Sequence, residues 1–169
     1  MIAIKYGIIF VIFILCFFIG NIISQKYVER LKELKDFKNA LNLIENKINF
    51  TYEPLQIVFE DISKMVCTNV SNIFVQAKEN MKTQNAEEAW NNALKTKYTN
   101  LLSEDIDSIK NFGKMLGKTD KEGQISCLKV TKSFLDIQIE KAKEEENKNS
   151  KIFKKLGTII GLVFVIILI

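Results

Sequence analysis

The feature that most restricts how this chain can fold is the placement of its charges, because both ends lack them. Residues 6–25 and 156–169 contain no Asp, Glu, Lys or Arg, whereas the segment between them is rich in all four. The first run has 20 residues. As a helix it would span roughly 30 Å, the thickness of the hydrocarbon core of a bilayer. An N-terminal transmembrane helix is therefore predicted over residues 1–25.

A cleaved secretory signal is the alternative interpretation of the first run. Such a signal needs a basic start, a short apolar core and a small-residue cleavage site. Lys5 and the N-terminal amine are the only early positive charges, and the sequence GNIISQ at the end of the run offers no such site. A retained anchor is the favoured interpretation.

The second run has 14 residues and would cover only about 21 Å as a helix. Lys154 and Lys155 precede it and can extend toward the interface, which lengthens the part that enters the membrane. Gly157 and Gly161 are four residues apart, a spacing that permits close packing against another helix. We therefore predict a C-terminal transmembrane helix over residues 151–169, packed on the first. A segment lying in the membrane interface is the alternative.

Basic residues border both runs on the side of the central segment, and such flanks mark the cytoplasmic side of a membrane. Residues 26–150 are therefore predicted to be a cytoplasmic domain. The flanking residues are Lys26, Arg30, Lys32 and Lys35 after the first run, and Lys148, Lys151, Lys154 and Lys155 before or at the start of the second.

The central segment has the pattern of an all-α domain. The whole chain has one Pro and seven Gly, too few for a sheet with many tight turns. Apolar residues recur at steps of three and four, which predicts about six amphipathic helices. Trp90 is expected to lie in their core. The polar stretch EKAKEEENKNSK is expected to be a solvated helical stalk leading back to the membrane.

Three helix starts are predicted from capping residues. Asn85 precedes Ala-Glu-Glu, Ser103 precedes Glu-Asp, and Thr119 stands three residues before Glu122. Gly117 is placed where a left-handed residue ends a helix. Residues 113–123 are therefore expected to form a helix–turn–helix hairpin, with a candidate partner-contact turn made of Gly113, Gly117, Lys118, Thr119 and Asp120.

The composition argues against several kinds of chemistry. The chain has no His, which is the commonest general base and zinc ligand near neutral pH, and its three Cys have no metal-ligand spacing. The sequence GKMLGKTD lacks the spacing of a phosphate-binding loop. A net charge of +4 with interspersed acids does not suggest nucleic-acid binding. The chain is predicted to be no enzyme and to use no cofactor, metal, nucleic acid or small-molecule substrate.

Several motifs together resemble the stage III sporulation protein AB family of endospore-forming Firmicutes, in a match that runs essentially from end to end. The entry helix has Tyr27-x-x-Arg30 and a Leu-rich continuation, and INFTYEPL follows it. AEEAW around Trp90, FGKMLGKTD and the tail KKLGTIIGLVFVIILI also match. One departure is Phe50, where the family has Tyr.

The resemblance implies a helical fold similar to the cytoplasmic domain of the F-type platform protein of type II secretion systems. It also implies a place in the mother-cell membrane, in a secretion-like channel complex between mother cell and forespore. The expected partners are a cytoplasmic secretion-type ATPase and other membrane subunits. A secreted or signalling helical domain, with a cleaved signal peptide or a sensor anchor, is the alternative function.

Overall fold

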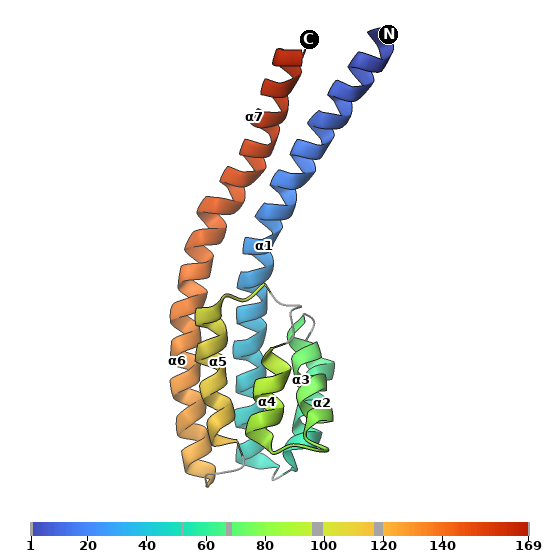
Figure 1. The fold of residues 1–169 in the computed structure, drawn as a ribbon. Helices are drawn as coiled ribbons and strands as arrows, with labels where there is room; N and C mark the ends of the chain where they lie inside the picture. Colours follow the sequence, from blue (N-terminus) through green and yellow to red (C-terminus); the bar gives the residue numbers. More distant parts are fainter. Residues whose placement is uncertain (1, 52, 67–68, 96–99, 117–119, 169) are drawn as a thin grey trace. The chain divides into compact units, whose positions relative to one another are not determined.

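The computed structural model describes residues 2–51, 53–66, 69–95, 100–116 and 120–168. The prediction of an all-α protein is confirmed, since the described ranges contain helices and no strand. The helices are α1 (Ile2–Phe50), α2 (Leu55–Met65), α3 (Asn69–Asn80), α4 (Ala86–Leu94), α5 (Ser103–Met115), α6 (Lys121–Glu145), the π-helical turn η1 (Glu146–Ser150) and α7 (Lys151–Leu168) (Figure 1).

The chain forms two compact units. One joins its two ends, Met1–Leu31 and Lys141–Ile169, and the other is the central segment Lys32–Glu140. The first half of α1 and all of α7 thus belong to the terminal unit, while the second half of α1 and α2 to α5 belong to the central one. Each unit has its own packing.

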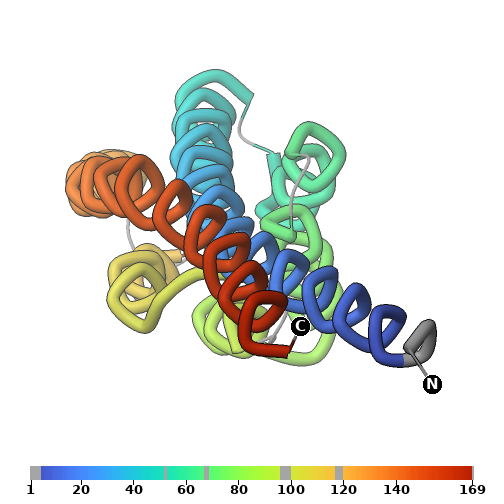
Figure 2. Tube along the Cα trace, turned by 90° about the horizontal axis from the view of Figure 1, so that it is seen from above, coloured from blue at the N-terminus to red at the C-terminus, as the bar shows by residue number. Residues whose placement is uncertain are grey.

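In the central unit, α2 packs on α3, α3 on α4 and α4 on α5. Figure 1 and Figure 2 show the second half of α1 between α5 and α6 on one side and α2 to α4 on the other. This half of α1 is amphipathic, and its apolar stripe is almost completely inaccessible to solvent because it lies at the centre of these helices. The stripe consists of Leu34, Phe37, Ala40, Leu41 and Ile44.

Trp90 lies in the core, as predicted, with 0% of its surface exposed. Its ring meets Phe59 and Phe74 at centroid distances of 5.6 and 5.3 Å, and Phe112 edge-on at 5.4 Å. The indole N–H donates to the carbonyl oxygen of Ile109 at 3.2 Å. Burial of this aromatic cluster, with its single polar atom satisfied, holds α2 to α5 together.

The helix starts confirm one predicted cap and correct another. Asn85 caps α4, because its side-chain oxygen accepts from the backbone N–H of Glu88 at 2.9 Å. The prediction that Ser103 caps α5 is wrong. Leu102 occupies the cap position, and the Asp105 carboxylate accepts from its backbone N–H at 2.9 Å. A carboxylate inside the first turn thus replaces the missing side-chain cap.

The start of α6, unlike that of α5, is one residue later than predicted. Asp120 precedes the helix, and its carboxylate accepts from the backbone N–H of Gly123 at 3.0 Å. This is the bond that an N-cap makes to the third helical residue. Asp120 therefore does the capping that the sequence pattern assigned to Thr119, which is outside the described residues.

A buried carboxylate ties α1 to the rest of the central unit. Glu33 is completely buried from solvent. It accepts from the side chains of Asn69 at 2.9 Å and Asn100 at 3.0 Å, and from the backbone N–H of Asn100 at 2.8 Å. A buried charge is tolerated when hydrogen-bond donors surround it in this way. Glu33 thus fixes the start of α3 and the segment before α5 against α1.

Ion pairs join the helices at the surface of the central unit. Lys132 of α6 reaches Glu45 of α1 at 2.5 Å. Glu60 of α2 accepts from Lys78 of α3 and from Lys64 of its own helix, each at 2.9 Å, and these bonds lower the pKa of its carboxyl to about 2. The pairs of Glu60 are exposed enough that their value lies mainly in orienting the side chains, whereas the Lys132–Glu45 pair is mostly buried.

A single π-helical turn, η1, separates α6 from α7. Ala142, in the helix before it, and Ser150, its last residue, are both buried and are eight residues apart. Two ordinary α turns contain only about 7.2 residues, so a wider turn is needed to bring both residues to the same face. The stalk predicted over these residues is helical, and η1 is a feature that its composition did not reveal.

Candidate functional site: the paired terminal helices

The first half of α1 is the apolar part of the longest helix. By length and composition, Lys5–Phe50 could cross a membrane. It is the one described helix that meets both criteria. α7 has 18 residues and includes three lysines near its start. From Leu156 onward its described residues are uncharged and most are exposed. Within the terminal unit, α1 and α7 run antiparallel, with the two chain ends at the same end of the pair (Figure 1).

Glycines bring the two helices into backbone contact. A Cβ atom added to Gly157 would lie 2.8 Å from the carbonyl oxygen of Cys16 and 3.0 Å from the Cα of Gly20. A Cβ on Gly20 would lie 2.7 Å from the carbonyl oxygen of Phe153. These are closer than real Cβ atoms approach backbone, so only glycine fits at both positions. Small residues at a helix crossing permit this kind of close approach in membranes.

Gly161 makes a second contact, one turn further along α7. A Cβ on this glycine would lie 2.8 Å from a ring carbon of Phe13. The structure thus places both predicted packing residues, Gly157 and Gly161, against α1. Gly20, the partner of Gly157 on α1, was missed by the sequence reasoning, because a single glycine in an apolar run carries no pattern.

Polar bonds continue the pairing at the other end of the terminal unit. The buried hydroxyls of Ser24 and Ser150 are 2.6 Å apart. One turn beyond Ser24, Tyr27 stacks on Phe153 at a centroid distance of 5.9 Å. The helix pair is thus joined by close backbone packing in its apolar part and by a hydrogen bond beside it.

An ion pair extends the same series of contacts. Arg30 of α1 donates to the Glu145 carboxylate at 2.6 Å, and the Arg30 side chain is only 5% exposed. A nearly buried guanidinium paired with a carboxylate is directional and costly to separate. The motif Tyr27-x-x-Arg30 therefore places both of its named residues in contact with the C-terminal part of the chain.

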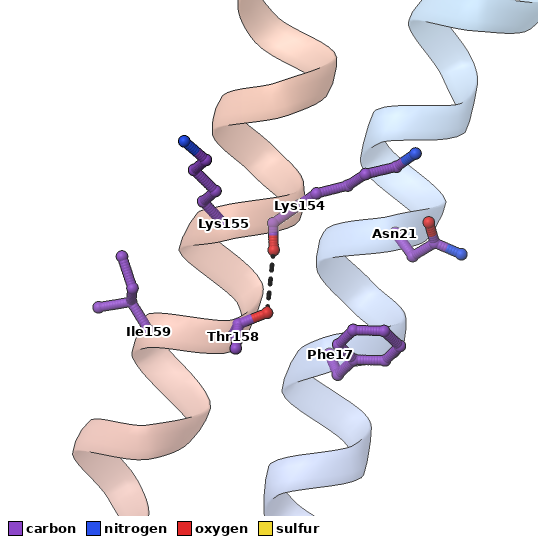
Figure 3. Close-up of a pocket in the computed structure, with 6 residues that line it drawn as sticks. All are labelled: Phe17, Asn21, Lys154, Lys155, Thr158 and Ile159. Atoms are coloured by element: carbon purple, nitrogen blue, oxygen red, sulfur yellow. Dashed lines mark hydrogen bonds between the residues drawn. The ribbon is translucent and has the colours of Figure 1, made fainter.

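An open groove of about 570 Å³ runs along the helix pair. Figure 3 shows the side chains that line it, with the lysines toward one end and the apolar side chains toward the other. The lining residues are Phe17 and Asn21 from α1, and Lys154, Lys155, Thr158 and Ile159 from α7.

The predicted partner-contact turn is divided by the structure. Gly113 lies inside α5 and is buried, and a Cβ there would collide with the Trp90 ring. Asp120 is exposed and caps α6. Gly117, Lys118 and Thr119 are outside the described residues. Within the described ranges, no group of three or more His, Cys, Asp or Glu is placed to hold a metal ion.

These features define a class: an all-α protein with one described helix able to cross a membrane, packed against the helix α7. The chain belongs to the stage III sporulation protein AB family, whose model matches residues 5–169. It is therefore a sporulation protein. The stage III sporulation protein AB of Bacillus subtilis (strain 168) is 26% identical over 153 residues, which cover 88% of this chain and 90% of that protein.

A solved structure of a stage III sporulation protein AB has the same fold. It superposes with a TM-score of 0.66 at 24% identity, over 70% of this chain and 96% of the solved one. This likeness supports the helical architecture described above.

Proposed function

We propose that this protein is a non-enzymatic membrane platform subunit of a secretion-like channel complex between mother cell and forespore. In this role it holds a helical domain at the cytoplasmic face of the mother-cell membrane. There it recruits a cytoplasmic ATPase and other membrane subunits needed for endospore development. The observation that carries the proposal is the backbone contact between α1 and α7 at Gly20 and Gly157.

This contact favours two membrane anchors over one. The exposed apolar side chains of α7 need a nonpolar environment, and α7 is bound to a helix that is itself able to cross a membrane. Lysines stand at the start of α7 and just after the apolar run of α1, which agrees with a central domain on the cytoplasmic side. A cleaved N-terminal signal would remove the glycine that α7 packs against.

Topology mapping tests this part of the proposal. Reporter fusions within Lys32–Glu140 should be active only in the cytoplasm, and fusions at both chain ends should be active only outside. The mature protein should retain its N-terminal segment in mass spectrometry. A central domain outside the cell, or a chain that begins near Ser24, would favour the secreted or signalling alternative.

A binding measurement tests the recruitment of an ATPase. We propose the hairpin at residues 113–123 as one contact surface, and its described, exposed charged residues are Lys114, Asp120 and Glu122. Asp120→Asn removes the charge but keeps an oxygen that can cap α6. Asp107→Asn is the matched control, since it changes another exposed carboxylate of the same unit. In co-purification with the sporulation ATPase, the first variant should weaken binding and the second should not. Equal binding by both would remove the hairpin as the contact.

A further inference from the structure

The groove beside the terminal helices is amphipathic along its length. In Figure 3 the ammonium groups of Lys154 and Lys155 lie toward one end, and Phe17 and Ile159 lie toward the other. The Phe17 and Ile159 side chains are 48% and 55% exposed, so the apolar end is uncovered. One open surface thus offers positive charge and hydrocarbon to the same occupant.

The ammonium groups of Lys154 and Lys155 have no partner in the part of the chain that the structure describes. Neither Lys154 nor Lys155 forms an ion pair there, whereas Arg30 of the same unit does. The neighbouring run of α1 contains no carboxylate that could neutralise them. Two lysines that are adjacent in sequence and uncompensated, at the start of an apolar helix, favour an anion at this place.

A polar group on the facing helix completes the site. Asn21 lies within the uncharged run of α1, and its side-chain amide makes no hydrogen bond to another described residue. An unsatisfied amide in an apolar segment is costly unless a ligand or water bonds to it. Thr158 needs no such ligand, because its hydroxyl donates to the Lys154 carbonyl oxygen at 3.2 Å. The donors that line the groove are therefore two ammonium groups and one amide, and in Figure 3 Lys154 and Asn21 lie on the α1 side while Lys155 points to the other side of α7.

We propose that this groove binds an anionic phospholipid, a proposal that rests on the membrane-spanning arrangement above. The phosphate lies between Lys154 and the Asn21 amide, Lys155 adds positive charge from the other side of α7, and an acyl chain runs along the apolar end past Phe17. A soluble anion would use only the charged end, and an apolar peptide would use only the other. A volume of about 570 Å³ is within the range of small-molecule sites, about 300–1,000 Å³.

Native mass spectrometry of the full chain tests this assignment. Wild-type protein is reconstituted into phosphatidylcholine vesicles containing one fifth phosphatidylglycerol, then extracted in mild detergent and examined for retained lipid. Lys154→Gln/Lys155→Gln should reduce retained phosphatidylglycerol by about tenfold or more. The control Lys148→Gln/Lys151→Gln removes the same charge outside the groove and should change retention less than about threefold. Equal losses in both variants would mean diffuse attraction and would overturn the site.

Two further arms separate a lipid from other occupants. Asn21→Leu leaves the charge unchanged and should lower retention by about fivefold, the value of roughly one hydrogen bond. Excess glycerol 3-phosphate should not displace the lipid, because it lacks acyl chains. If it displaces the lipid fully, the groove is an anion site and the proposal fails.

Carbonate extraction of cell membranes, done in parallel, tests anchoring by itself. Wild type and all variants should remain in the membrane fraction. Release of the wild type would refute the two-anchor function, while the detergent measurement would still decide whether the groove selects anionic lipid.

Discussion

Replacement of Gly157 by leucine should separate the terminal helices. Even the first atom of a side chain, its Cβ, would lie 2.8 Å from the Cys16 carbonyl oxygen, whereas ordinary contact begins at 3.4 Å. The backbones must therefore move apart by at least about 0.6 Å, and by more for the rest of the leucine. The nearest atoms belong to backbone, so no side-chain rotation relieves the overlap. Overpacking of this kind costs about 1–3 kcal/mol.

The Ser24–Ser150 contact provides the assay. Cysteines at these two positions, in a background with the native cysteines replaced by alanine, should cross-link within one chain when membranes are oxidised, since the serine oxygens are 2.6 Å apart. Gly157→Leu should reduce the initial rate of cross-linking by about tenfold, as expected for roughly 1.4 kcal/mol. Electrophoresis without reductant resolves the two forms.

Gly7→Leu is the matched control for this experiment. It makes the same chemical change in the same apolar helix, but nothing lies within 4 Å of a Cβ at Gly7. Its cross-linking rate should equal that of the parent. Wild-type cross-linking in the Gly157 variant, or equal losses in both variants, would refute the claim that glycine contact sets the distance between the helices.

Three other predictions concern the central unit, measured by denaturant unfolding of the full chain in detergent and followed through its sole tryptophan. Gly113→Ala should destabilise the unit by about 1–2 kcal/mol, because overpacking against the indole exceeds the gain in helix propensity, while the exposed Asn111→Ala in the same helix should not destabilise it. Glu33→Gln should cost about 1–3 kcal/mol, since an amide NH₂ then faces donors where a carboxylate oxygen accepted; an unchanged midpoint would contradict the buried network. Glu60 has a pKa lowered to about 2, so its contribution is complete above its unfolded pKa near 4.5 and disappears as the pH falls toward 2. The stability difference between wild type and Glu60→Gln should vanish over that interval, and a constant difference would show that the lysine contacts are not responsible.

The helices themselves could be predicted from local information. Their apolar stripes repeat at helical spacing, and Asn85 marks a boundary that the structure retains. The core position of Trp90 also followed from its place on an amphipathic helix. In each case the sequence pattern and the structure that it predicts lie within a few residues of each other, so a single sequence is sufficient for the prediction.

The exact cap positions were harder to predict from the sequence. Ser103 is a better capping residue than Leu102 by type, yet Asp105 supplies the hydrogen bond from inside the helix. The two arrangements have nearly the same sequence pattern and differ by one residue of register. Tertiary packing, which the local pattern does not contain, selects between them.

The candidate site depended most on distant contacts. Glycine near a helix end commonly terminates the helix, and the sequence pattern therefore places Gly113 in the hairpin. In the structure, Gly113 lies against the ring of Trp90, which leaves no room for a side chain. Gly20 gave no signal because its partner, Gly157, is at the other end of the chain. The pairing of Glu33 with Asn100 was likewise outside the reach of periodicity.

The π-helical turn has a consequence for how the length of this chain can vary. Loss of one residue from Glu146–Ser150 would restore an ordinary α-helix there, because seven residues would then separate Ala142 from Ser150 and two α turns hold about 7.2. The helix beyond would keep nearly the same phase, so Gly157 would still face Cys16. Loss of one residue from the ordinary helix on either side would instead rotate α7 by about 100° and turn Gly157 away. A one-residue deletion is therefore tolerated within this short segment and not beside it.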